Sequence, residues 1–147
     1  MTEPTLPAPT LQADLTLQSA LGEVGVIRQE PGRVAIEYEV APHMCHSGGV
    51  AQGGFVCGWI DAAMARAQMS LNPDLTPMSL EVKVSFFAPA RPGRVIAEAW
   101  IERAGRSTSF AEGRLTNLAG DVLAKASSTL RLIPRAAVEA SSRKAMG

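Results

Sequence analysis

The segment from Phe55 to Leu71 constrains the fold most, because it is long, helix-like and almost without a polar face. Apolar side chains lie most of the way round a helix drawn through it, and Asp61 and Arg66 are its only charged residues. A helix that is apolar on nearly every side belongs inside a protein rather than on its surface. The sequence therefore predicts one buried helix that other elements must enclose.

Segments with alternating apolar and polar residues flank this helix and predict β-strands. Two precede the helix, at residues 24–27 and 33–40. Four follow it, with turn signals about ten residues apart, a spacing typical of an antiparallel meander. These four cover residues 79–90, 94–103, 107–117 and 122–134. Gly113, inside the third of them, predicts a β-bulge.

The economical architecture for this pattern is α+β, with a curved antiparallel sheet wrapped round one long helix. The predicted domain covers residues 20–134, an ordinary size for a single domain. Residues 1–19 are expected to form a flexible N-terminal arm or a short helix, and residues 135–147 a mobile C-terminal tail. One sheet and one helix leave apolar surface uncovered, so we also expect a partner subunit.

Charge and composition argue against several kinds of partner. Basic and acidic residues balance at 14 each, whereas a nucleic-acid-binding protein would present a basic face. No run of about 18 apolar residues is present, so no membrane span is expected. The N-terminus lacks the basic-then-apolar form of a secretory signal, and two cysteines do not make a disulfide framework. We therefore expect a cytoplasmic protein.

Three stretches of the sequence resemble the hotdog-fold thioesterases of the phenylacetic-acid-degradation, or PaaI-like, type. They are GGVAQGGFVCGWIDAAMA, SLEVKVSFFAPARPGRVIAEAWIERAGRS and GDVLAKASSTLRLI. The most specific part is a Gly-Gly pair followed, eight residues after its first glycine, by an acid on a buried helix. The resemblance covers roughly residues 20–134 and implies a hotdog fold, a homodimer or dimer of dimers, and hydrolysis of acyl-CoA thioesters. No cofactor and no metal are expected.

The resemblance also implies roles for individual residues. Gly53 matches the glycine whose backbone N–H polarises the thioester carbonyl, and Asp61 matches the catalytic carboxylate. Ser79 matches a serine that helps to place the water in some members. Gln52 stands where the family usually has His, and His46 where it usually has Asn. Both of these positions lie beside the thioester in the family, so they bear on substrate choice.

Elementary chemistry agrees with a helix N-terminus and an acid as partners. Backbone N–H groups there stabilise a developing oxyanion, and Gly53 and Gly54 lack side chains that would keep a ligand away. The Asp61 carboxylate can serve as general base or nucleophile. Eight residues of helix rise about 12 Å, which separates Gly53 from Asp61 within one chain. Antiparallel helices across a two-fold axis would instead join Gly53 of one subunit to Asp61 of the other.

Other interpretations stay open at this stage. His43, Cys45, His46 and Cys57 could bind zinc on residue type, although their spacing fits no zinc pattern. A Walker loop is excluded because Phe55 follows the glycine pair where that motif needs Lys.

Three polar residues are candidate substrate contacts rather than catalytic groups. Gln52 and His46 can either cap the loop or donate hydrogen bonds near the carbonyl. Arg106, at a turn, could meet the phosphates of CoA. The alternative function is a protein that binds acyl-CoA or an acyl carrier without hydrolysing it.

Overall fold

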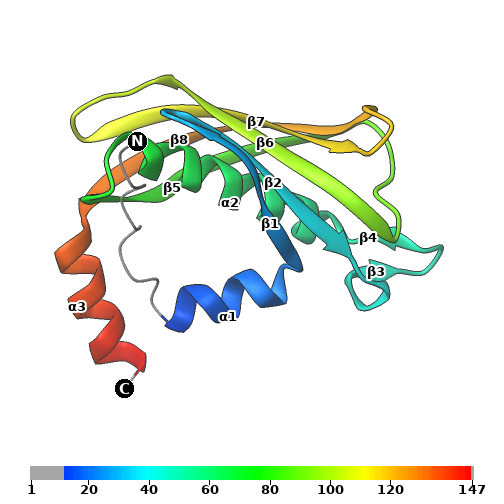
Figure 1. Cartoon of the computed structure of the whole chain (residues 1–147), viewed down its shortest axis with the longest axis horizontal. Coiled ribbons are helices and arrows are strands. Elements are labelled where there is room, and N and C mark those ends of the chain that lie inside the picture. Colours follow the sequence, from blue (N-terminus) through cyan, green and yellow to red (C-terminus); the bar gives the residue numbers. More distant parts are fainter. Residues whose placement is uncertain (1–11, 147) are drawn as a thin grey trace, which may run out of the picture.

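The computed structural model describes residues 12–146 and contains one long central helix and a six-stranded antiparallel sheet (Figure 1). The helices are α1 (Gln12–Ala20), η1 (Pro42–Met44), α2 (Gly53–Leu71) and α3 (Arg135–Met146). The strands are β1 (Glu23–Glu30), β2 (Arg33–Val40), β3 (Cys45–His46), β4 (Val50–Ala51), β5 (Leu75–Phe86), β6 (Gly93–Arg103), β7 (Thr108–Asn117) and β8 (Val122–Pro134). The predicted α+β arrangement of a long helix and an antiparallel sheet is confirmed.

The order of strands in the large sheet differs from a simple meander. It runs β1-β2-β6-β7-β8-β5, so only β6, β7 and β8 follow one another as sequential neighbours after α2. β5 leaves α2 at the far edge of the sheet and pairs with β8, while β6 returns to pair with β2. Alternation of residues predicts strands but does not say which strands pair, and a helix lying across one face lets the chain change edges.

The buried side of α2 packs on the middle of the sheet. Trp59, Ile60 and Met64 are fully buried, and the Trp59 indole N–H donates to Leu21 O at 2.8 Å. Burial of a side chain as large as Trp59 contributes several kcal/mol to stability. Among the described residues, no helix is long and apolar enough to cross a membrane.

Gly113 lies where α2 crosses β7, and its role differs from the predicted bulge. Its pairing with both neighbouring strands is regular, and the register shift opposite Leu115 and Thr116 is an extra residue of β8, Leu123. A Cβ on Gly113 would sit 2.5 Å from Cγ2 of Ile60, far inside contact distance. The prediction of a bulge at Gly113 is therefore wrong, and the glycine instead lets the helix approach the sheet.

A bulge does occur in β5, between Ser79 and Glu81. Ser79 pairs with Leu130 and Glu81 with Thr129, so Leu80 is the extra residue. An extra residue reverses the alternation of faces along a strand. As a result Ser79, before the bulge, faces α2. Three residues after the bulge face α2 as well: Val82, Val84 and Phe86.

The chain after β8 forms a helix, where the sequence led us to expect a mobile tail. Residues 135–146 make up α3, which carries an ion pair one turn apart between Arg135 Nε and Glu139 Oε1 at 2.6 Å. Such i,i+4 pairs and a high content of Ala, Arg, Glu and Lys favour helix. The mobility of this segment stays a prediction, and the part of the predicted N-terminal arm before residue 12 lies outside the described residues.

Candidate active site

The N-terminus of α2 is held by the short hairpin of β3 and β4. Ala51 N–H donates to Ala90 O at 2.7 Å, which ties the hairpin to the loop after β5. Gln52 N–H donates to Met44 O at 2.9 Å, which fixes the residue just before the helix. These two bonds set the position of Gly53 relative to the β5–β6 loop.

The N–H groups of the first turn of α2 have unequal partners. Gly54 N–H donates to Oε1 of the Gln52 side chain at 2.8 Å. Phe55 N–H and Val56 N–H donate to the Gln52 carbonyl oxygen at 2.9 and 3.5 Å. Within the described chain, Gly53 N–H has no acceptor. One backbone donor is therefore left for a ligand at this helix end, where the helix dipole favours negative charge.

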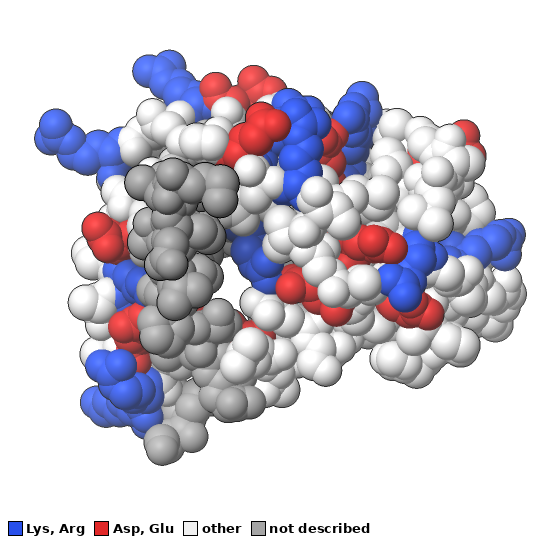
Figure 2. Space-filling view, viewed as in Figure 1, with Lys and Arg blue, Asp and Glu red and all other residues white. Residues whose placement is uncertain are grey.

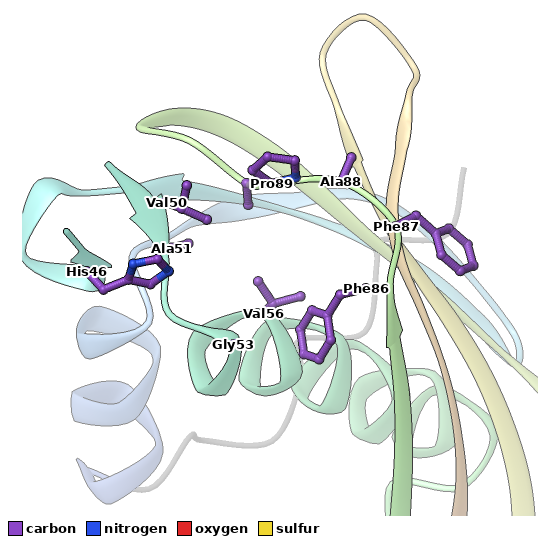
Figure 3. A pocket seen from close by; sticks show the side chains of 10 residues that line it. His46, Val50, Ala51, Gly53, Val56, Phe86, Phe87, Ala88 and Pro89 are labelled. Carbon is purple, nitrogen blue, oxygen red and sulfur yellow. The ribbon is translucent and has the colours of Figure 1, made fainter. Parts of the chain in front are cut away.

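An open cleft of about 380 Å³ lies beside Gly53 (Figure 3). The Phe86 ring lines the cleft, and its Cζ would lie 3.2 Å from a Cβ placed on Gly53. In the close-up, the Phe86 ring points toward the start of α2, whereas the Phe87 ring points away from it. Apart from the histidine, the lining is apolar; it consists of His46, Val50, Ala51, Gly53, Val56, Phe86, Phe87, Ala88, Pro89 and Ala90.

His46 is the one titratable side chain of the cleft lining. Its Nδ1 lies 2.8 Å from Ser47 O, and because a carbonyl only accepts, Nδ1 carries the proton of that bond. The ring is thereby oriented and Nε2 is left for other contacts. The structure places His46 at the cleft beside Gly53, and its contact with substrate stays a prediction.

Asp61 and Ser79 meet, although they come from different elements. Ser79 Oγ donates to Asp61 Oδ1 at 2.6 Å, from β5 to the exposed side of α2. Asp61 is half-buried, and none of the ion pairs among residues 12–146 involves it. Burial raises the pKa of the Cys57 thiol, one turn earlier, and the negative charge of Asp61 raises it further.

The two arginines considered from the sequence lie away from this carboxylate. Arg66 Nη2 pairs with Glu23 Oε1 at 2.7 Å, which fastens α2 to the start of β1. Arg106 is exposed in the turn between β6 and β7, at the opposite end of the sheet from Gly53 (Figure 1). One chain therefore does not bring Arg106 to its own cleft.

The possible zinc cluster does not assemble. The described residues contain no group of three or more His, Cys, Asp or Glu side chains placed to hold a metal ion. Cys45 Sγ instead donates to Ala41 O at 3.7 Å.

Basic and acidic side chains are interleaved over the face of the molecule seen in Figure 2.

The fold and this cleft can be set beside known proteins. The model of the thioesterase superfamily matches residues 48–124, which include β4, α2, β5 to β7 and the start of β8. The chain belongs to the thioesterase superfamily. The predicted hotdog fold, the PaaI-like resemblance and the assignment as a thioester hydrolase are thereby confirmed at the level of the family.

Individual members of the thioesterase superfamily are similar over most of the chain. Human acyl-coenzyme A thioesterase 13 is 23% identical over 117 residues, which span 78% of this chain and 84% of the relative. The PaaI protein of the E. coli phenylacetic acid degradation operon has 21% identity and a TM-score of 0.75, covering 80% of this chain and 84% of its own. A variant of PaaI from Thermus thermophilus has 26% identity and a TM-score of 0.71, covering 79% and 97%.

Two contacts of the site were not found from the sequence, although capping by Gln52 was one of the alternatives it left open. Phe86 lines the cleft beside Gly53, and Gln52 turns its side chain back onto Gly54. The paired aromatic residues in SFFAP were a usable signal for Phe86, since the end of a strand beside a glycine pair is a place where a ligand can lie. Nothing in the sequence indicates the rotamer of Gln52.

Proposed function

We propose that this protein is an acyl-CoA thioesterase in which Gly53 N–H polarises the thioester carbonyl and Asp61 activates the attacking water. The carrying observation is that, within residues 12–146, Gly53 N–H at the start of α2 has no acceptor and faces a cleft whose lining side chains are apolar except for His46. A backbone N–H at a helix N-terminus is a suitable donor to the oxyanion that forms when water adds to the carbonyl.

The Asp61–Ser79 pair supports the second half of the proposal. The Ser79 hydroxyl occupies Oδ1 of Asp61 and orients the carboxylate, which leaves Oδ2 to accept a proton from water. The water oxygen then bonds to the carbonyl carbon, the carbon–sulfur bond breaks, and the CoA thiolate takes up a proton. Asp61 has no basic partner in the described chain that would hold it as a structural ion pair.

The distance between these two groups supports a site shared between subunits. Eight residues of helix separate Gly53 from Asp61 by about 12 Å, too far for one carbonyl group. Among the described residues the outer edge of β5 pairs with no strand, and this strand exposes the large apolar side chains of Leu80 (62%) and Phe86 (58%), which a second copy of the chain could cover. We propose a homodimer that joins Gly53 of one subunit to Asp61 of the other; a dimer of dimers, and a contact of Arg106 with CoA phosphates, stay predictions.

The cleft also favours one kind of acyl group. Its lining is apolar except for His46, so it offers no fixed cation for a charged acyl group. An uncharged aliphatic or aromatic acyl group beside Gly53 is the best match to this lining.

The test is thiol release from a panel of uncharged and carboxylated acyl-CoA thioesters, with Asp61→Asn beside the wild type. Asn has the size of Asp and can accept the Ser79 hydrogen bond, but it cannot take a proton. We expect kcat to fall by about 10²–10⁴-fold with the melting temperature unchanged. Equal turnover by Asp61→Asn on every substrate would exclude this role, and tight binding without wild-type turnover would favour the binding-protein alternative.

A further inference from the structure

We infer that Gln52 is a positioning residue that selects Gly53 N–H as the one donor available to the substrate. Gln52 lies at the N-cap of α2, with extended backbone angles of φ −62° and ψ 138°. The inference rests on the proposed function, because it concerns the donor to which that function assigns the thioester carbonyl.

The partners of the first turn show how the selection works. An α-helix leaves its first four N–H groups without intrahelical acceptors. Gln52 accepts from two of them, taking Gly54 N–H with its side chain and Phe55 N–H with its carbonyl, while its own N–H donates to Met44 O; Val56 N–H makes the first intrahelical bond, to the same carbonyl. Only Gly53 N–H remains, and Gly53 is also the residue of this turn that lines the cleft together with Val56.

The side chain of Gln52 acts through the backbone rather than on the substrate. Because an N–H requires an acceptor, the bond to Gly54 fixes Oε1, and not the amide nitrogen, against the helix. Gln52 is exposed and does not line the cleft, whereas His46 does. The structure therefore favours a cap over the direct substrate contact that the sequence allowed for Gln52.

The cap matters because Gly54 would otherwise compete. The glycine pair has no side chain to shield its N–H groups, so a second free donor would let the carbonyl oxygen bind in two ways. An oxygen held by the wrong N–H would be displaced from the attacking water, and misplacement on the scale of 1 Å is costly in catalysis. Occupying Gly54 N–H leaves one binding mode and also holds the first turn in place.

Two variants separate capping from direct donation by the Gln52 amide. Gln52→Met keeps the length of the side chain but has no oxygen to accept from Gly54. Gln52→Ser is a good N-cap and accepts from the same turn, yet it has no amide N–H to donate. Gln29→Met, on the exposed strand β1, is a matched control for the loss of a surface glutamine.

Kinetics give the first readout. We expect kcat of Gln52→Met to fall about fivefold to tenfold with KM within about twofold, the size of effect that follows from losing one N-cap. Gln52→Ser is expected to recover kcat to within about threefold of wild type, and Gln29→Met to match wild type. If Gln52→Ser were as slow as Gln52→Met, the amide would be a direct donor and the inference would be overturned; equal kcat for all variants would overturn it as well.

Amide NMR gives a readout that does not depend on turnover. The Gly54 N–H should exchange with solvent slowly in wild type and in Gln52→Ser, and faster in Gln52→Met. A non-hydrolysable acyl-CoA analogue with CH₂ in place of sulfur should shift the Gly53 amide proton in wild type, and both glycine amides in Gln52→Met. Absence of wild-type turnover would defeat the proposed function alone, whereas an analogue that shifts Gly54 in wild type would defeat the selection by Gln52.

Discussion

The two sides of α2 differ in what they are built to do, although they share one helix. On the sheet side, Trp59, Ile60 and Met64 are fully buried. Gly113 lies opposite Ile60 and Met64, and because it has no side chain the helix can pack closely against the sheet. On the side toward the edge strand β5, which we call the open side, Gly53 N–H has no acceptor among residues 12–146, and within the same range the Asp61 carboxylate hydrogen-bonds only with Ser79. We therefore expect stability to depend mainly on the side toward the inner strands and the proposed chemistry on the side toward β5, so substitutions on each should be separable.

The largest expected effect is on the sheet side. Trp59→Ala removes a fully buried indole and its hydrogen bond to Leu21 O, so the free energy of unfolding should fall by about 3–5 kcal/mol. Thiol release per folded molecule should stay close to wild type, because Trp59 does not line the cleft. Denaturant unfolding and active-site titration measure the two quantities. A loss of kcat in Trp59→Ala without a loss of stability would contradict the proposal that this side of α2 serves stability and not catalysis.

A smaller loss of stability is expected at the helix–sheet contact. Gly113→Ala places a Cβ against Ile60, which forces a shift that costs about 1–3 kcal/mol. Ile60→Ala removes the opposing methyl group, so the double variant should be more stable than the sum of the two single changes predicts. Thermal denaturation of the four proteins tests this. Strict additivity would mean that Gly113 does not act through its contact with Ile60.

The smallest effect is expected on the open side, at Ser79. Ser79→Ala removes the hydrogen bond that orients Asp61, and kcat should fall about tenfold, in line with the worth of one hydrogen bond to a charged group. Stability should hardly change, because Ser79 is exposed. Ser79→Thr keeps the hydroxyl and serves as the control in steady-state kinetics. If Thr were as slow as Ala, orientation by the hydroxyl would not be the reason for the loss.

The sequence predicted the parts of this structure that depend on local pattern. The long helix and the strand segments follow from periodicity, and the helix was placed within two residues of its start at Gly53. Pairing of β5 with β8 was missed, because partners in a sheet are chosen by the whole chain and not by alternation. α3 was missed although its content of Ala, Arg and Glu favours helix.

The candidate site was predicted in its residues more than in its contacts. The glycine pair and Asp61 stand out because they interrupt an apolar run, and the structure brings Ser79 to Asp61, a contact that the resemblance did not specify. The Gln52 cap and the place of Phe86 depend on side-chain rotamers, which no spacing reveals. The roles of these residues in catalysis remain for the experiments above.

Because Leu80 is an extra residue in β5, a change in the number of residues in this strand and a change in their identity should have different effects on the Ser79–Asp61 contact. Removing Leu80 would leave Ser79 and Val82 two residues apart, so under strict alternation both would still face α2. Substitution or deletion of the exposed Leu80 should therefore keep the Ser79–Asp61 contact, whereas deletion of Lys83, where the pairing is regular, should turn either Ser79 or Val84 away from α2. In this strand the number of residues carries information that their identities do not.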